Sequence, residues 1–134
     1  MKKDIVIPDA HGLVLVFIAE KDASQRKTWT VGIKNERSKL LSNIIINAQG
    51  HGRIKGKDKQ TANVRFLIES LACGELKTFE VLLTDSMKLE NTYRISFFEE
   101  NTLLERTFSV PPGFLALQKK EKVEPSGKPG VFIR

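Results

Sequence analysis

One loop, residues 50–60, holds the residues of this sequence that are best suited to chemistry. Its four cations, Arg53, Lys55, Lys57 and Lys59, occupy every second position among glycines and polar residues. Glycines let backbone amides approach an anion and cationic side chains neutralise it, so we define these four residues as a candidate anion patch. The competing interpretation is a hairpin tip whose charges face water.

The spacing of this loop excludes the two common glycine-rich nucleotide motifs. A phosphate loop that ends at Gly56-Lys57 needs glycine at position 51 and serine or threonine at position 58, but the chain has His51 and Asp58 there. The glycines at positions 50, 52 and 56 also miss the dinucleotide-binding pattern. We therefore expect no nucleotide cofactor at this loop.

Catalytic and metal-binding residues need partners at defined spacings, and the sequence provides none. His11, His51 and Cys73 fall on separate expected turns, without the paired spacing of metal ligands or of a nucleophile and its base. Glu99 and Glu100 are adjacent carboxylates at an expected hairpin tip, where water makes them ordinary acids. We assign no catalytic, cofactor-binding or metal-binding residue and predict that the protein is not an enzyme.

Two strands and a polar turn, residues 28–50, form the frame that would position these residues. Trp29, Val31 and Ile33 alternate with polar or small residues, which is the period of a half-buried strand. Residues 35–38 are turn formers. A second strand follows, with Ile44, Ile46 and Ala48 as its inward set.

The remaining chain predicts further short strands. A strand is expected at residues 2–7. The apolar run at residues 13–20 is typical of a strand that is buried on both faces or that lies across a sheet crossing. The segment at residues 62–71 could be a strand or a helix, and its alternation favours a strand. A further strand is expected at residues 77–84, followed by a hairpin over residues 92–110. The expected inward residues are Val64, Phe66, Ile68, Phe79, Val81, Leu83, Tyr93, Ile95, Phe97, Leu104, Phe108 and Val110.

Seven to eight short strands without a clear helix predict an all-β antiparallel β-sandwich over residues 1–112. Pro111-Pro112-Gly113 ends the expected sheet, because proline cannot donate to a strand ladder. Residues 113–134 are expected to form a basic C-terminal extension. Its apolar end, residues 131–133, is expected to dock on this domain or on a neighbouring molecule.

The same alternation leaves several apolar residues pointing away from the core. We define a candidate protein interface by Ile45, Leu67, Leu82 and Phe98, with Leu103 beside them. Apolar side chains from several strands can form a contiguous patch, which marks a protein interface or a site covered by the chain's own tail. The expected occupants are residues 131–133, an unknown protein partner, or a second copy in a homodimer.

Charge and cysteine content set the remaining limits. The 134 residues contain 22 lysines and arginines against 16 acidic residues, which gives a net charge of +6 and permits a polyanionic partner. The single cysteine, Cys73, excludes a disulfide within the chain and favours a reducing compartment. The apolar run at residues 13–19 is too short to span a bilayer, and no secretory apolar region follows the first lysines. We expect a soluble cytoplasmic protein with no membrane partner.

Part of the chain resembles immunoglobulin-like sandwiches of the CARDB type. The resemblance rests on Asn35 at the end of one strand, the corner Leu71-Ala72-Cys73-Gly74-Glu75, and Tyr93 at the start of a later strand. It covers roughly residues 28–98 and implies an immunoglobulin-like fold. Cys73 stands where proline is usual in that pattern, and the basic segment at residues 50–60 is an insertion relative to it.

The whole chain also resembles a family of small standalone bacterial proteins of no established function, some of which carry a phenylalanyl-tRNA synthetase subunit label. The resemblance rests on the expected strand at residues 61–69, on the lysine-rich tail that closes on Gly130 and Val131, and on Trp29, Asn35, Asn43, Gly50, Tyr93, Phe97 and Phe98. No arginine-bearing motif of a class II aminoacylation site is present, so the enzymatic label does not transfer.

Two functions from different classes follow from these observations. The favoured prediction is a non-enzymatic protein-interaction module that binds through an apolar sheet face or edge. The alternative is a nucleic-acid or tRNA-associated accessory protein. It would use the loop at residues 50–60 and the tail lysines Lys119, Lys120, Lys122 and Lys128.

Overall fold

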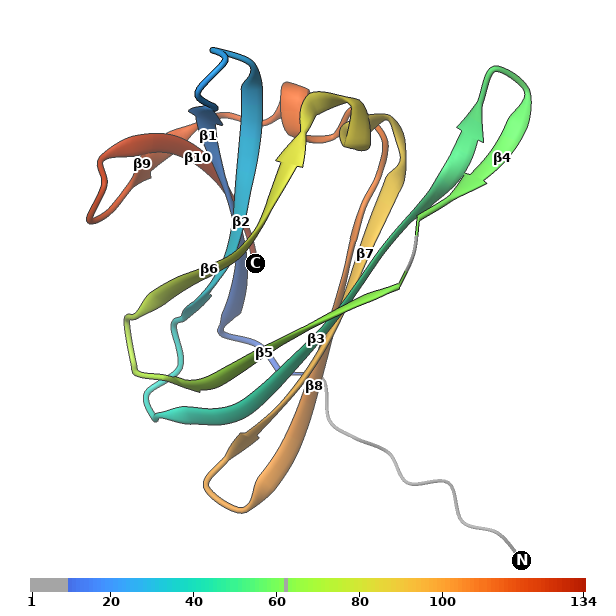
Figure 1. The fold of residues 1–134 in the computed structure, drawn as a ribbon. Coiled ribbons are helices and arrows are strands. Elements are labelled where there is room, and N and C mark those ends of the chain that lie inside the picture. Colours follow the sequence, from blue (N-terminus) through green and yellow to red (C-terminus); the bar gives the residue numbers. More distant parts are fainter. Residues whose placement is uncertain (1–9, 62) are drawn as a thin grey trace, which may run out of the picture.

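The chain folds into two antiparallel β-sheets packed face to face, as the computed structural model in Figure 1 shows. The structure describes residues 10–61 and 63–134. The strand expected at residues 2–7 lies outside the described residues. The prediction of an all-β sandwich is confirmed, with ten strands in the described residues against the seven to eight expected.

The first sheet has the strand order β6-β2-β1-β10-β9. Its strands are β1 (Leu13–Lys21), β2 (Lys27–Asn35), β6 (Leu76–Leu83), β9 (Glu121–Val123) and β10 (Lys128–Ile133). β1 lies in the middle, paired with β2 on one side and β10 on the other. Both of its faces are covered, because Leu15 and Phe17 join the main core while Val14 and Val16 pack with Val123 of β9. This explains its continuous apolar sequence.

The second sheet is built around the long strand β3. Its strands are β3 (Leu41–Ile54), β4 (Lys57–Gln60), β5 (Val64–Leu71), β7 (Glu90–Glu99) and β8 (Thr102–Val110). β7 occupies one edge of β3 and pairs in turn with β8. β4 and β5 follow one another along the other edge of β3. They are separated where Gly50 donates its N–H to Thr61 Oγ1 at 2.7 Å.

The connections between strands follow an immunoglobulin-type order. β1, β2 and β6 correspond to the A, B and E strands of such sandwiches, and β3, β7 and β8 correspond to C, F and G. β9 and β10 extend the first sheet beyond this set. Two short 3₁₀ segments, η1 (Thr84–Lys88) and η2 (Leu115–Leu117), lie together at the end of the sandwich that holds the β1–β2 turn (Figure 1).

The inward faces of most strands are those expected from the alternation. The buried residues that confirm it are Trp29, Val31, Ile33, Ile44, Ile46, Ala48, Ile68, Tyr93, Ile95, Phe97, Leu104, Phe108 and Val110. Phe17 lies at the centre of the core. Its ring meets Trp29 and Tyr93 edge-on, with centroid distances of 6.4 and 6.1 Å. Such edge-to-face pairs stabilise a core beyond the area that they bury.

Strand β6 contradicts the alternation. Val81 and Leu83, expected to be inward, are 63% and 43% exposed, whereas Leu82 packs against the core. The cause is a register shift against β2: Val31 pairs with Glu80, but the next residue pairs with Thr78. The extra residue, Phe79, forms a bulge, and one extra residue moves every later side chain to the opposite face.

The C-terminal segment is part of the sandwich and not an extension of it. β10 pairs with β1 over four register positions, from Leu15 with Ile133 to Ile18 with Gly130. Leu115 and Val131 are buried in the main core. The apolar end therefore docks on its own chain, as one of the expected alternatives. It lies on the edge of β1 and not over the outward apolar residues of the second sheet.

Candidate interaction surface

The outer face of the second sheet gathers most of the apolar residues of the predicted interface. Leu67 of β5 lies opposite Ile45 of β3, and Ile45 in turn lies opposite Ser96 of β7. Two residues further along β7, Phe98 lies opposite Leu103 of β8. Side chains at such positions are in contact across a sheet face. We call Ile45, Leu67, Phe98 and Leu103 the apolar patch.

The apolar patch is open to solvent. Leu67 is 71% exposed, Leu103 is 39% exposed and Phe98 is 36% exposed. Ile45, at the middle of the sheet, is half-buried. Four neighbouring strands each contribute one member, as two directly opposed pairs, Leu67 with Ile45 and Phe98 with Leu103, on either side of Ser96.

Leu82 does not belong to this surface. The bulge in β6 turns its side chain toward the core, and β6 belongs to the first sheet. Leu82 lines a small cavity of about 160 Å³ together with Glu80 and Tyr93. Its assignment to the interface is therefore wrong, and the physical reason is the register shift described for β6.

A polar basin adjoins the apolar patch on the same outer face. It has a volume of about 440 Å³, and its lining residues are Asn47, Gln49, Asn63, Arg65, Thr92 and Arg94. Asn47 lies opposite both Arg65 and Arg94 in the register, and its Oδ1 accepts a hydrogen bond from Arg65 Nε at 3.3 Å. None of these lining residues is a carboxylate. We call this the arginine basin.

Arg65 and Arg94 are absent from the predicted interface, although the sequence contains a signal for them. Arg65 is two residues from Leu67, and Arg94 is four residues from Phe98, so strand alternation places each on the outward face with the apolar patch. The predicted interface contains outward apolar residues only. Outward cations on the same strands complete the surface.

The residues of the predicted anion patch are distributed over two sides of the β3–β4 hairpin. Arg53 lies opposite Asp58, and its Nε donates to Asp58 Oδ1 at 3.0 Å. Lys57 and Lys59 alternate with Asp58, so they point to the other side of the hairpin. Lys55 is at the turn, with a positive φ of 53°. The structure thus leaves Lys57 and Lys59 together and pairs Arg53 with an acid.

The other reactive side chains are held by separate contacts. His51 Nε2 lies 3.2 Å from Glu90 Oε1. Arg37 donates to both carboxylate oxygens of Glu99, at 2.7 and 3.0 Å, and lowers the pKa of that carboxyl. Glu100 pairs with Lys39. Across the described part of the chain, no three histidine, cysteine or acidic side chains converge to hold a metal.

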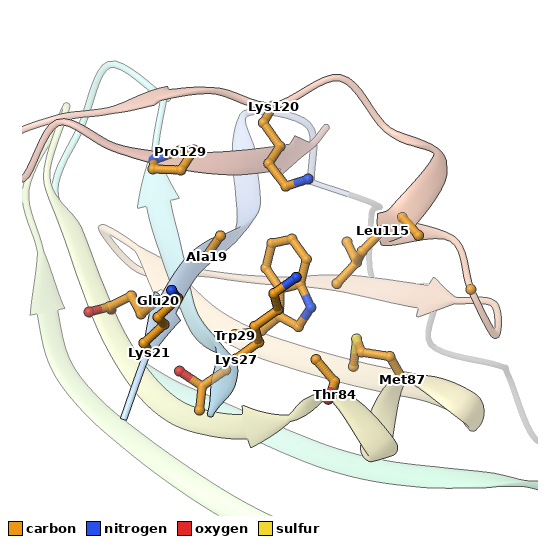
Figure 2. Close-up of a pocket in the computed structure, with 13 residues that line it drawn as sticks. Ala19, Glu20, Lys21, Lys27, Trp29, Thr84, Met87, Leu115, Lys120 and Pro129 are labelled. Carbon is orange, nitrogen blue, oxygen red and sulfur yellow. The ribbon is translucent and has the colours of Figure 1, made fainter. Parts of the chain in front are cut away.

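A further cavity lies at the η1–η2 end of the sandwich, and the sequence did not predict it. Its volume is about 580 Å³, and Trp29 lines it together with residues from β1, η1 and η2 (Figure 2). Trp29 was expected to be a core residue, and it is, with 9% of its surface exposed. The lining comes from segments far apart in the chain, so no local pattern marks it.

The fold and the surfaces define a two-sheet β-sandwich with a mixed apolar and basic outer face. No protein-family model, curated protein sequence or solved structure matches this chain. The family resemblances drawn from the sequence therefore stay predictions. Within residues 10–61 and 63–134, no helix is long and apolar enough to cross a membrane.

Proposed function

We propose that this protein is a non-enzymatic interaction module that binds an acidic, partly apolar protein segment across the outer face of the second sheet. The observation that carries the proposal is the adjacency of the apolar patch and the arginine basin on one face. An interface of this kind needs apolar residues that are desolvated on binding and charged residues that set orientation.

The apolar patch supplies the driving force. Full burial of an exposed Leu or Phe side chain stabilises an association by roughly 1.5–3 kcal/mol. Leu67 is 71% exposed, so a partner can bury the largest fraction of its side chain. Leu103 and Phe98 extend the same surface toward the β8 edge.

The arginine basin supplies the selection for acidic partners. Arg65 and Arg94 flank Asn47 on neighbouring strands, and no carboxylate among the basin residues competes for them. A guanidinium holds a carboxylate through two parallel hydrogen bonds, which an ammonium cannot do. The net charge of +6 also disfavours a second copy of this chain as the occupant, because two like-charged molecules repel.

Polyanion binding is the second candidate, and Lys57 and Lys59 on one side of the β3–β4 hairpin favour it. Three observations weaken it. Arg53 is paired with Asp58, and Lys128 of the tail is paired with Glu20 at 2.6 Å. The arginine basin also has no aromatic lining residue on which a base could stack.

The test is capture of partners from lysate of the source organism by the full-length protein, with and without nuclease, read by mass spectrometry. We expect to recover an acidic protein whose capture is unaffected by nuclease treatment. L67S/F98S should weaken its binding at least tenfold, which corresponds to about 1.4 kcal/mol. R65Q/R94Q should weaken it similarly and reduce its salt dependence.

Two control variants make the outcome specific. Val81 is 63% exposed on the other sheet, so V81S removes a comparable apolar side chain and should leave binding unchanged. K57Q/K59Q removes the same charge as R65Q/R94Q and should also leave it unchanged. Recovery of RNA alone, lost with nuclease and with K57Q/K59Q, would support polyanion binding. Self-association that L67S abolishes would support a homodimer.

A further inference from the structure

We propose that the cavity at the η1–η2 end of the sandwich binds a small amphipathic anion, whose apolar body lies against Trp29 and whose acidic group meets a rim of lysines. This site is separate from the outer face of the second sheet. It stands on different residues, so it does not depend on the proposed function.

The size and walls of the cavity fit a small molecule. A volume of about 580 Å³ lies within the usual range of roughly 300–1,000 Å³ for small-ligand pockets. Its apolar walls are Ala19 of β1, Trp29 of β2, Met87 of η1 and Leu115 of η2. Figure 2 shows Leu115 and Met87 on one side of the indole and Glu20 and Lys21 on the other.

Trp29 provides a rigid surface for a flat or aliphatic body. Its ring packs edge-on against the buried Phe17, with an interplanar angle of 81°. Its strand neighbours in β1 and β6, Ala19 and Leu82, hold the backbone on both sides. An aromatic side chain that is fixed in this way binds an apolar group with little loss of conformational entropy.

Lysines set the charge of the rim. Lys21, Lys27 and Lys120 all line the cavity, and none of them has a carboxylate partner among the described residues. Lys120 reaches down over the indole, with Nζ 5.8 Å from the ring centroid (Figure 2). An ammonium held by a π face there is available to an incoming acidic group.

The single carboxylate in the lining does not neutralise this rim. Glu20 accepts a hydrogen bond from Lys128 Nζ at 2.6 Å, so its charge is already matched. That contact also lowers the pKa of Glu20 and keeps it ionised. Three lysines therefore remain to attract a carboxylate, sulfonate or phosphate. A neutral apolar molecule would be stabilised only by its contact with Trp29 and not by the lysines.

The chain contains one tryptophan, Trp29, so its fluorescence reports dye binding, and the variants below show at which site the dye binds. The full-length protein is titrated with the anionic dye 8-anilinonaphthalene-1-sulfonate and, separately, with the neutral dye N-phenyl-1-naphthylamine. We expect one anionic dye per chain, with quenching of Trp29 by energy transfer. Affinity for the neutral dye should be at least fivefold lower, and added salt should weaken binding of the anionic dye alone.

Variants separate this site from other apolar surface. K120Q and K27Q change exposed side chains, and each should lower the affinity for the anionic dye at least threefold. K119Q removes the adjacent charge, which does not line the cavity, and should have no effect. L67S/F98S removes the apolar patch and should leave Trp29 quenching unchanged.

Three results for the dyes and the lysine variants would overturn the proposal, and a fourth comes from the L67S/F98S variant. The first three are the absence of saturable quenching, equal affinity for the two dyes, and equal effects of K119Q and K120Q. Thermal unfolding of each variant, measured in parallel, shows that the fold is retained. Loss of dye binding in L67S/F98S would place the dye on the outer face of the second sheet and would count against the cavity.

Discussion

At the scale of single residues, one partly buried hydrogen bond to a carboxylate joins the two sheets. Glu80 of β6 accepts a hydrogen bond from the buried Tyr93 hydroxyl of β7 at 3.0 Å. Burial raises the pKa of Glu80, and the hydrogen bond from Tyr93 offsets part of that rise. Burial and the nearby Glu80 charge together raise the pKa of Tyr93, so its hydroxyl remains a donor. The carboxylate is thus tolerated between the sheets at some cost to stability.

The raised pKa of Glu80 makes the folding stability depend on pH. The folded state retains a proton that the unfolded state releases from about pH 4.3 upward, so Glu80 lowers stability as the pH rises through its folded pKa. Glu80→Gln keeps an acceptor for Tyr93 and removes the charge. We expect a higher Tm than wild type at pH 7 and an equal Tm at pH 4.

Thermal unfolding between pH 4 and pH 8 measures this effect. Glu69→Gln serves as the control, because Glu69 is exposed, and it should follow the wild-type profile. If the Glu80→Gln profile ran parallel to wild type at every pH, the proposed ionisation of Glu80 between the sheets would be wrong.

At the scale of elements, β10 makes the first sheet continuous. It lies between β1 and β9, and it brings Val131 into the main core. Gly130 permits the close approach of these strands. A Cβ at this position would stand 2.7 Å from the Phe17 carbonyl oxygen and 2.5 Å from Val123 Cγ2. The backbone oxygen cannot move aside without disturbing the pairing of β1 with β10.

Gly130→Ala tests whether the C-terminal segment is integral to the domain. The overlap with Phe17 should destabilise the protein by about 1–3 kcal/mol, as overpacking does elsewhere. Urea unfolding measures the loss. Lys122→Ala on the exposed side of β9 should change stability by less than about 0.5 kcal/mol. Equal stability of Gly130→Ala and wild type would mean that β10 does not pair with β1 in solution.

At the scale of the whole molecule, the positive charge is spread over separate surfaces. The β3–β4 hairpin projects away from the sandwich (Figure 1), the arginine basin lies on the second sheet, and the lysine rim lies at the η1–η2 end. Spread charge of this kind gives non-specific attraction to polyanions that salt screens. A specific polyanion site would require one of these surfaces to dominate.

Retention on heparin distinguishes the two cases. R53Q/K55Q/K57Q removes three charges from the hairpin, and K119Q/K120Q/K122Q removes three from the C-terminal segment. Under the proposed function, we expect both variants to elute at the same reduced salt concentration, because only net charge matters. Selective loss of retention in the hairpin variant would favour the nucleic-acid alternative.

Local alternation determined much of this protein from the sequence alone. The inward residues of segments 29–33, 44–48 and 93–97 are as expected, because the two-residue period of a strand depends only on its own backbone. The same parity put Ile45, Leu67 and Phe98 on the outer face, and it contains the information that also places Arg65 and Arg94 there. A sandwich follows, since several half-apolar strands must cover one another.

Pairing between distant segments was decided only by the tertiary structure. The bulge at Phe79 arises from the register of β6 against β2, so the local pattern of β6 gave the wrong face for Leu82. The basic C-terminal segment became two strands because β1 offers it an edge and the core accepts Val131. The cavity over Trp29 is lined by residues as distant as Ala19 and Pro129. The alternation of a strand repeats every two residues and can be read locally. These features depend instead on contacts between residues that lie up to about a hundred positions apart in the chain.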